Sequence, residues 1–184
     1  MRRHSTILAC AAFAVLGLCL LVAGGCGNAK WPWQQDDKPA ALDMAQVTVT
    51  ASGHEKAAYG DFGPSLVTDG NLADASSWRV EGRGQWIHFD LKQVCTVSAV
   101  QIAFMRGKER KYMFAIELSA DGTKWQRIFE GSSSGGSAAL ERFTLPVTQA
   151  RYVKLVGGGN TDPKFANWFN LTEVKIEAAP AAKS

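Results

Sequence analysis

Apolar and polar residues alternate in short runs between positions 46 and 177, with turn residues between the runs. In the run 85–91, for example, Ile87, Phe89 and Leu91 share one face. No segment of this region has the 3.6-residue period of an amphipathic helix. The period of two predicts strands at 46–51, 85–91, 98–104, 113–119, 125–130, 141–146, 150–156 and 171–177. Eight short strands at this spacing predict an all-β, antiparallel sandwich of the jelly-roll type.

The N-terminus has a different pattern. Residues 7–23 form an apolar run without a charge, which follows a basic start and precedes two glycines and Cys26. This layout predicts an export signal in residues 1–25 rather than a part of the fold. Cys26 resembles the lipidated cysteine of bacterial lipoproteins, which would anchor the protein to a membrane of the cell envelope. A plain secretory peptide and an uncleaved membrane anchor are the alternatives.

Composition then divides the rest of the chain. Residues 26–44 contain prolines and no periodicity, so they predict a tether, and residues 179–184 predict a loose tail. The folded region is therefore expected at 45–178.

Without the two basic residues of the leader, the chain has 18 Lys and Arg and 17 Asp and Glu, a net charge of about +1. This balance gives no support to nucleic-acid binding. Cys95 is the one cysteine of the folded region and is interpreted as a small buried apolar residue.

The densest basic cluster lies between the predicted strands 98–104 and 113–119. It contains Arg106, Lys108, Arg110 and Lys111, with Glu109 as its one acid. We expect an exposed loop here, whose charges contribute little to folding. The planar guanidinium group matches a carboxylate, so the cluster favours an acidic polymer as ligand. The alternative is a loop whose charges only keep the sheet edge soluble.

Five ordered motifs carry a family resemblance: "VTDGNLADASSW", "GQWIHFDL", "FAIELSADGTKW", "ARYVKLVG" and "NWFNLTEVKI". Together they resemble the coagulation factor V/VIII type C, or discoidin, domain over residues 45–178. More narrowly, the chain resembles the family 32 carbohydrate-binding modules that are attached to alginate lyases. The resemblance implies an eight-stranded jelly-roll sandwich with a structural calcium ion and a ligand site on loops at one end.

The implied calcium site has candidate ligands in the first motif. Asp69, Asn71, Asp74 and Ser76 offer hard oxygen donors on one turn-forming segment. The spacing is not that of an EF-hand loop. Glu173 matches the distant carboxylate that closes the site in the related domains. The alternative is an Asp, Asn and Ser turn that bonds only to its own backbone.

The implied ligand site draws on several loops. Asn, Arg and Glu can hydrogen-bond sugar hydroxyls, and an exposed aromatic ring can stack on a pyranose. Trp168 is open to a core or a ligand role, whereas Trp78, Trp86 and Trp125 are interpreted as core. The candidate ligand residues are His54, Glu55, Tyr59, Arg79, Glu81, Arg106, Lys108, Arg110, Lys111, Asn167, Trp168 and Asn170.

These expectations describe a non-catalytic module that binds an acidic polysaccharide, such as alginate, and that works beside a polysaccharide-degrading enzyme. One alternative is a discoidin domain for adhesion to protein or lipid. A small glycan-degrading enzyme is the other, with Glu55 and Glu81 as an acid–base pair. His54 and His88 are the histidines that remain after the leader, and neither lies in a zinc or triad motif.

Overall fold

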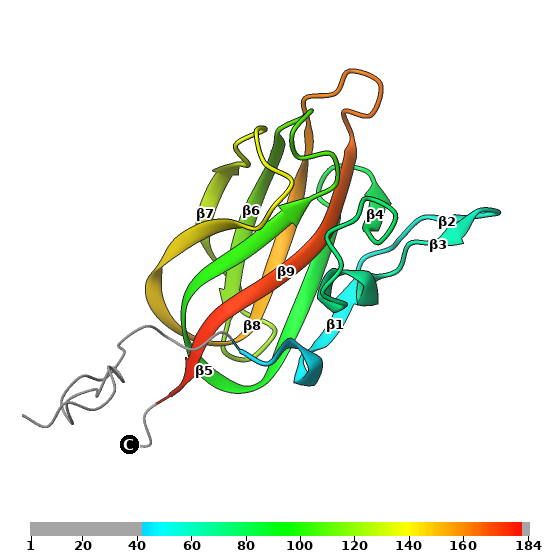
Figure 1. Ribbon diagram of the computed structural model, residues 1–184. Helices are drawn as coiled ribbons and strands as arrows, with labels where there is room; N and C mark the ends of the chain where they lie inside the picture. Colours follow the sequence, from blue (N-terminus) through cyan, green and yellow to red (C-terminus); the bar gives the residue numbers. More distant parts are fainter. Residues whose placement is uncertain (1–41, 182–184) are drawn as a thin grey trace, which may run out of the picture. The chain divides into compact units, whose positions relative to one another are not determined.

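The computed structural model describes residues 42–181 (Figure 1). The predicted signal segment, Cys26 and most of the predicted tether lie outside these residues. Two short 3₁₀ turns are present, η1 (Met44–Gln46) and η2 (Pro64–Thr68). The strands are β1 (Thr48–Ala51), β2 (Lys56–Ala57), β3 (Gly60–Asp61), β4 (Trp78–Glu81), β5 (Trp86–Phe104), β6 (Tyr112–Ser119), β7 (Gln126–Ser132), β8 (Glu141–Asn160) and β9 (Trp168–Pro180). The predicted all-β class is confirmed.

All pairings are antiparallel, in the order β4-β9-β5-β8-β6-β7, with β1 beside β5 and β2–β3 as a separate hairpin. The start of β5 pairs with β1 and with the end of β8, whereas its second half pairs with β9 and with the start of β8. β5 and β8 therefore pass from one layer of the sandwich to the other.

This continuity differs from the prediction, which separated 85–91 from 98–104 and 141–146 from 150–156. In β5 the register shifts between Asp90 and Cys95. Lys92 lies there at φ 69°, and its N–H donates to Asp90 Oδ1 at 2.8 Å. A left-handed residue and a local cap bend the strand without ending its ladder. The alternating runs 85–91 and 98–104 are thus two halves of one strand, β5. β4 and the β2–β3 hairpin were not predicted.

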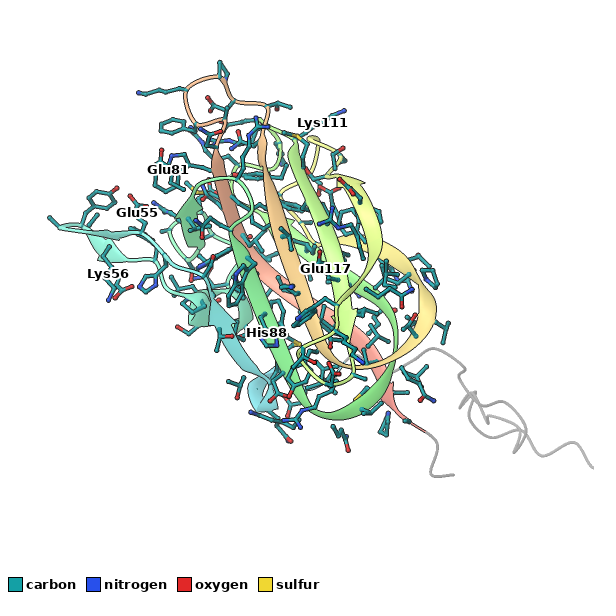
Figure 2. All side chains as sticks on the ribbon, turned by 180° about the vertical axis from the view of Figure 1, so that it is seen from behind. Glu55, Lys56, Glu81, His88, Lys111 and Glu117 are labelled. Carbon is teal, nitrogen blue, oxygen red and sulfur yellow. The ribbon has the colours of Figure 1, made fainter. Side chains whose placement is uncertain are left out.

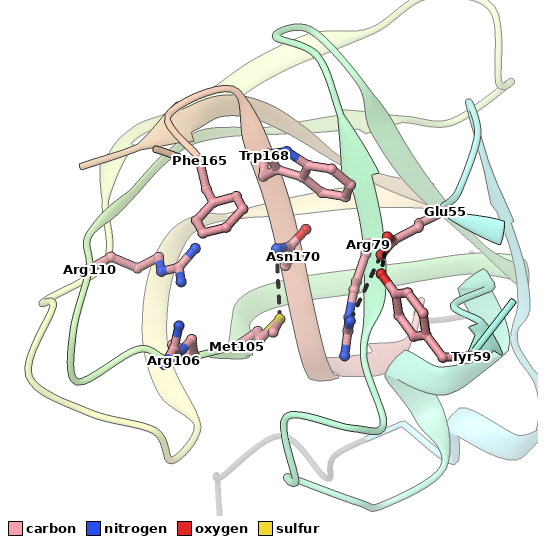
Figure 3. A pocket seen from close by; sticks show the side chains of 9 residues that line it. All are labelled: Glu55, Tyr59, Arg79, Met105, Arg106, Arg110, Phe165, Trp168 and Asn170. Atoms are coloured by element: carbon pink, nitrogen blue, oxygen red, sulfur yellow. Dashed lines mark hydrogen bonds and ion pairs between the residues drawn. The ribbon is translucent and has the colours of Figure 1, made fainter. Parts of the chain in front are cut away.

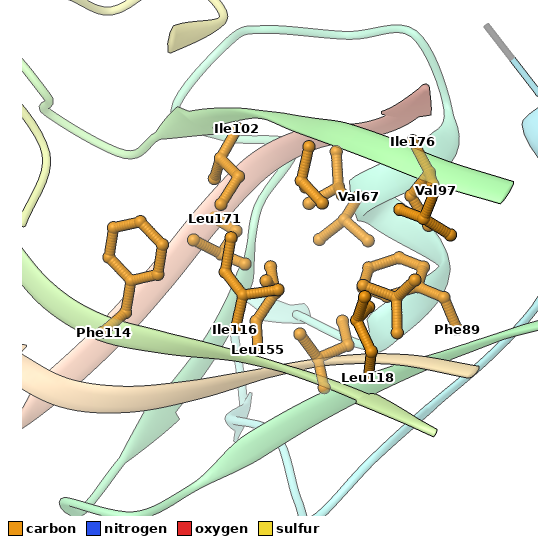
Figure 4. Packing of buried hydrophobic residues seen from close by; sticks show 14 of the residues in the cluster. Val67, Phe89, Val97, Ile102, Phe114, Ile116, Leu118, Leu155, Leu171 and Ile176 are labelled. Carbon is orange, nitrogen blue, oxygen red and sulfur yellow. The ribbon is translucent and has the colours of Figure 1, made fainter. Parts of the chain in front are cut away.

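The core between the layers is apolar and rich in aromatic rings (Figure 4). The Phe114 ring lies 5.0 Å from that of Phe143 and 5.4 Å from that of Phe129. The largest fully buried side chains of the domain are Trp78, Tyr112, Phe89, Phe104, Phe169, Ile87, Ile102, Ile116, Leu155, Leu171, Ile176 and Glu177.

The interpretation of Trp86 and Trp125 as core residues is wrong. Trp86 alternates with buried Ile87, so its side chain lies half-buried on the outer face of β5, where His88 also lies. The Lys154 ammonium group covers the Trp125 ring at 3.8 Å from its centroid. Figure 2 shows His88 and Glu117 on the same outer face.

The described domain is slightly longer than the predicted range 45–178. The N–H of Leu42 donates to the carbonyl of Ile176 at 3.0 Å, and Met44 packs against the core. β9 continues to Pro180, which pairs with Cys95. These contacts lie at the end of the sandwich opposite the loops 105–111 and 161–167 (Figure 1). No helix within residues 42–181 is long and apolar enough to span a membrane.

Candidate functional site

A pocket of about 210 Å³ lies among the loops at one end of the sandwich (Figure 3). Its residues come from the β2–β3 region, from β4, from the turn after β5, and from β9 with the loop before it. We call it the arginine pocket because three guanidinium groups line it. The lining residues are Glu55, Tyr59, Arg79, Met105, Arg106, Arg110, Phe165, Trp168 and Asn170. Seven of the twelve predicted ligand residues are among them.

Arg79 is held on one wall by contacts of its guanidinium group to three neighbouring side chains. Its Nε donates to Ser77 Oγ at 2.8 Å, and Nη1 lies 3.8 Å from Glu55 Oε2. The group also covers the Phe62 ring at 3.7 Å from the centroid. The hydroxyl of Tyr59 donates to Glu55 Oε1 at 2.8 Å, and this bond to a carboxylate raises the tyrosine pKa. Tyr59 is still 73% exposed at the hairpin tip, so its ring is open to a ligand.

The opposite wall carries Arg106 and Arg110, which have different environments. Arg106 is exposed and pairs through Nε with Glu109 at 3.0 Å. Arg110 is only 4% exposed, its Nη2 lies 3.4 Å from Asp162 Oδ2, and its guanidinium carbon lies 5.6 Å from the Phe165 ring centroid. The expectation that Arg110 is exposed on its loop is wrong.

Arg110 is buried because of the shape of the turn after β5. The N–H of Gly107 donates to the carbonyl of Phe104 at 3.0 Å, and the N–H of Arg110 donates to that of Arg106 at 3.3 Å. A Cβ on Gly107 would lie 2.1 Å from the carbonyl oxygen of Ser137. The turn is therefore tight and packed against a neighbouring loop, and it directs residue 110 inward.

Two buried polar atoms at the pocket have no hydrogen-bond partner among the described residues: Arg110 Nε and Asn170 Oδ1. The amide of Asn170 is oriented by Met105, whose sulfur accepts from Nδ2 at 3.7 Å. Buried polar groups in proteins are nearly always paired. One unpaired donor and one unpaired acceptor at the same pocket are thus suited to a ligand that carries both kinds of group.

The remaining predicted ligand residues lie outside the arginine pocket. His54 Nε2 lies 2.8 Å from Asp61 Oδ1, and Asn167 Oδ1 accepts from Arg83 Nε at 3.2 Å. Glu81 and His54 line a separate hollow beside Glu55 and Trp168. Lys108 and Lys111 are exposed near the pocket, and within residues 42–181 neither has an ion-pair partner.

Sequence reasoning missed Met105 and Phe165. Phe165 is the one large apolar residue in the segment 161–167, and an exposed ring on a loop is a signal for a ligand site. Met105 directly follows the core residues of β5 and offers no such signal. Trp168, for which core and ligand roles were both open, is half-buried and lines the pocket.

The predicted calcium ligands divide into two groups. Asp69 Oδ1 accepts from the N–H of Asn71 at 2.8 Å, and its Oδ2 accepts from the Ser76 hydroxyl. Glu173 Oε2 accepts from the N–H of Gly70 at 3.1 Å. Burial raises the Glu173 pKa, and the charge of nearby Asp69 adds to the effect.

Asp74 has another orientation, because its Oδ1 accepts from the N–H of Arg106 at 2.9 Å. Across residues 42–181 no group of three or more His, Cys, Asp or Glu is arranged to hold a metal ion. Of the predicted calcium ligands, Asp69, Ser76 and Glu173 are the side chains whose contacts gather at Asp69–Asn71. Asn71 Oδ1 accepts from the N–H of Ala73 at 3.0 Å. This contact belongs to the alternative interpretation, in which the turn bonds to its own backbone.

Comparison with known proteins identifies the family. The F5/8 type C domain matches residues 48–171. The family 32 module of AlyQ, solved in complex with 4,5-unsaturated mannuronic acid, is 35% identical with a TM-score of 0.66, over 74% of this chain and 96% of that one. The chain belongs to the F5/8 type C family, as a family 32 carbohydrate-binding module.

Two further structures support this family 32 assignment. A truncated AlyQ with its family 32 module and alginate lyase domains is 34% identical with a TM-score of 0.67, over 78% of this chain and 34% of that one. A pectin-binding carbohydrate-binding module is 30% identical with a TM-score of 0.63, over 74% and 94% of the two chains. A search of curated proteins found no match.

Proposed function

We propose that this family 32 module binds an acidic polysaccharide of the uronate class, such as alginate, through the arginine pocket. The observation that carries the proposal is the convergence of Arg79, Arg106 and Arg110 on one pocket that also has aromatic walls. A guanidinium group presents a planar set of donors that matches a carboxylate. Rings such as Trp168 and Phe165 can face the apolar side of a pyranose.

Each of the three arginines already has a carboxylate neighbour, so the pocket is not simply a positive hole. These pairs occupy only part of the donors, since each guanidinium group has five N–H bonds. Arg110 uses Nη2 toward Asp162, and its Nε has no partner within residues 42–181. Asn170 Oδ1 can accept from a sugar hydroxyl. At about 210 Å³ the pocket is smaller than typical small-molecule sites of roughly 300–1,000 Å³ and suits one sugar ring better than several.

The relatives support the ligand class. One module of at least 30% identity was solved with an unsaturated mannuronic acid, and another is described as pectin binding. Both are carboxylated glycans. Lys108 and Lys111 would add long-range attraction for such a polymer, which salt should screen.

We also propose that the module acts without catalysis and in partnership with a separate polysaccharide-degrading enzyme. Glu55 accepts from Tyr59 through Oε1 and pairs with Arg79 through Oε2, so both of its oxygens already have partners. Glu81, its suggested partner, lies outside the arginine pocket, in the separate hollow that Glu55 also lines. The anchor at Cys26 and a place in the bacterial cell envelope are part of the same proposal and follow from the leader alone.

A structural calcium ion is the third part of the proposal. Asp69 and Glu173, with oxygens of the 69–76 loop, would hold it and would fix the loop to β9. Burial is the main cause of the raised pKa of Glu173 and the charge of Asp69 adds to it, so a bound cation would offset both effects. The bound ion would supply charge neutralisation and no chemistry.

The test is calorimetric titration of alginate oligomers and of neutral oligosaccharides into the domain at two salt concentrations. We expect binding of alginate that weakens with salt, and weaker binding of the neutral chains. Lys108→Ala with Lys111→Ala should reduce the salt dependence while binding persists. Equal affinity for charged and neutral chains would reject the uronate proposal, and loss of polymer without added enzyme would reject the non-catalytic role.

A further inference from the structure

The loop between η2 and β4 contacts two of the pocket arginines. Asp74 is central to these contacts: its Oδ1 accepts from the backbone N–H of Arg106 at 2.9 Å, and its carbonyl accepts from Arg79 Nη2 at 3.0 Å. The same carbonyl accepts from Ser77 Oγ at 2.7 Å, and Ser77 Oγ accepts from Arg79 Nε at 2.8 Å. One short segment thus connects opposite walls of the pocket.

The contact to Arg106 supports a strained backbone. Arg106 has φ 53°, in the left-handed region that is unfavourable for a residue with a side chain. Its N–H donates to Asp74 Oδ1, and this acceptor favours the conformation in which Arg106 is seen. Without that acceptor the left-handed conformation of Arg106 is less stable, and its guanidinium group would move away from the pocket.

The contact to Arg79 involves one exposed partner, Asp74, and one buried partner, Ser77. Ser77 is fully buried and directly precedes β4, where Arg79 lies. The Asp74 carbonyl and Ser77 hydroxyl therefore hold the planar guanidinium group at two of its nitrogens. This fixes its orientation, which matters for a bidentate contact to a carboxylate.

We infer that Asp74 is a positioning residue of the arginine pocket, which sets the separation of Arg79 and Arg106 through its carbonyl and its carboxylate. The inference rests on the proposed function in that the ligand is taken to be a uronate. It replaces the expectation that Asp74 ligates calcium, because its carboxylate is oriented toward Arg106 while Asp69 and Glu173 lie around Gly70.

A pair of substitutions separates positioning from metal ligation. Asp74→Asn keeps an oxygen acceptor for the Arg106 N–H but removes the charge that a calcium ligand needs. Asp74→Ala removes both. Leu72→Ala is the control in the same loop, since the Leu72 side chain is 42% exposed and belongs to neither the arginine pocket nor the proposed calcium site.

The experiment measures alginate-oligomer affinity for the wild type and the three variants in calcium-containing buffer, with melting curves beside each. We expect Asp74→Ala to weaken binding about five- to tenfold, as loss of one hydrogen bond implies, while Asp74→Asn and Leu72→Ala stay within about twofold. Unchanged affinity in Asp74→Ala would overturn the inference. Equal loss in Asp74→Asn and Asp74→Ala would also overturn it, since charge and not the acceptor would then matter.

A readout without ligand keeps the inference separate from the proposed function. Amide hydrogen exchange at Arg106, followed by NMR, should accelerate at least fivefold in Asp74→Ala and not in Asp74→Asn. If the wild type binds no uronate, the proposed function fails while this measurement still decides whether Asp74 positions Arg106. Unchanged exchange at Arg106 in Asp74→Ala would reject the positioning role.

Discussion

Replacing Arg110 by Ala should both weaken ligand binding and destabilise the fold. The side chain is 3% exposed and lies between Asp162 and the Phe165 ring. The substitution removes a buried guanidinium group, leaves the Asp162 carboxylate without its partner, and opens space beside Phe165. A residue on a solvated loop would have none of these effects.

The stability loss can be estimated from the exposure of the two partners. Removal of one member of a fully buried pair costs about 3–5 kcal/mol. Asp162 is 25% exposed, so water can solvate the carboxylate in part, and we expect a smaller loss of about 2 kcal/mol. For a domain of this size that corresponds to a melting temperature lower by roughly 4–10 °C. Loss of a charged hydrogen bond to the ligand should weaken alginate binding by about 1–3 kcal/mol.

The assay combines urea and thermal unfolding with calorimetric titration of alginate oligomers. Lys108→Ala is the matched control, because Lys108 is an exposed cation in the same turn, and we expect its stability to stay within about 0.5 kcal/mol of the wild type. Asp162→Asn should recover part of the stability in the Arg110→Ala background, since it removes the unpaired charge. A melting temperature of Arg110→Ala equal to that of the wild type would refute this account of the turn.

Three further predictions concern the fold. The pKa of Asp90 lies at about 2, below its ordinary 3.8, chiefly because Arg151 donates a hydrogen bond to it. The ionised Asp90 therefore contributes its full stability above pH 3.8, and this contribution is lost as the pH falls through 2. Urea unfolding between pH 1.5 and 5 should show this pH dependence of stability in the wild type and a smaller one in Asp90→Asn. Gly157→Ala should cost about 1–3 kcal/mol, because a Cβ would lie 2.5 Å from the buried Phe169 ring, whereas Gly53→Ala, whose Cβ would meet Val80 at 3.9 Å, should be tolerated. Calcium should raise the melting temperature of the wild type and not that of Glu173→Gln, because an ion that binds only the native state stabilises it. A wild-type melting temperature that changes with neither calcium nor chelator would contradict the proposed calcium site.

The sequence pattern was sufficient for the fold class because the period of two is a local property. It did not show that two predicted strands join into β5, since the bend at Lys92 depends on a left-handed residue and on Asp90 as a cap. The position of Trp86 was in fact available from the pattern. It alternates with Ile87, so the parity that places Ile87 in the core places Trp86 outside.

The arginine pocket was predictable in part. Loops known from the resemblance supplied residues such as Tyr59, Arg79 and Trp168. The burial of Arg110 was not predictable, because it depends on a turn closed by Gly107 and on Asp162, which is distant in sequence. The orientation of Asp74 toward Arg106 likewise depends on the spatial meeting of two loops.

The central claim is that the arginine pocket recognises the carboxylate of a uronate. Its most direct test is calorimetric titration of one set of alginate oligomers in two forms, native and chemically reduced at the carboxyl group, into the same wild-type domain. The two ligands share length and ring type and differ mainly in the groups that the three arginines would bind. We expect the native oligomers to bind at least tenfold more tightly at low salt, and the difference to shrink as salt increases. Equal affinity for the native and the reduced oligomers would contradict the claim.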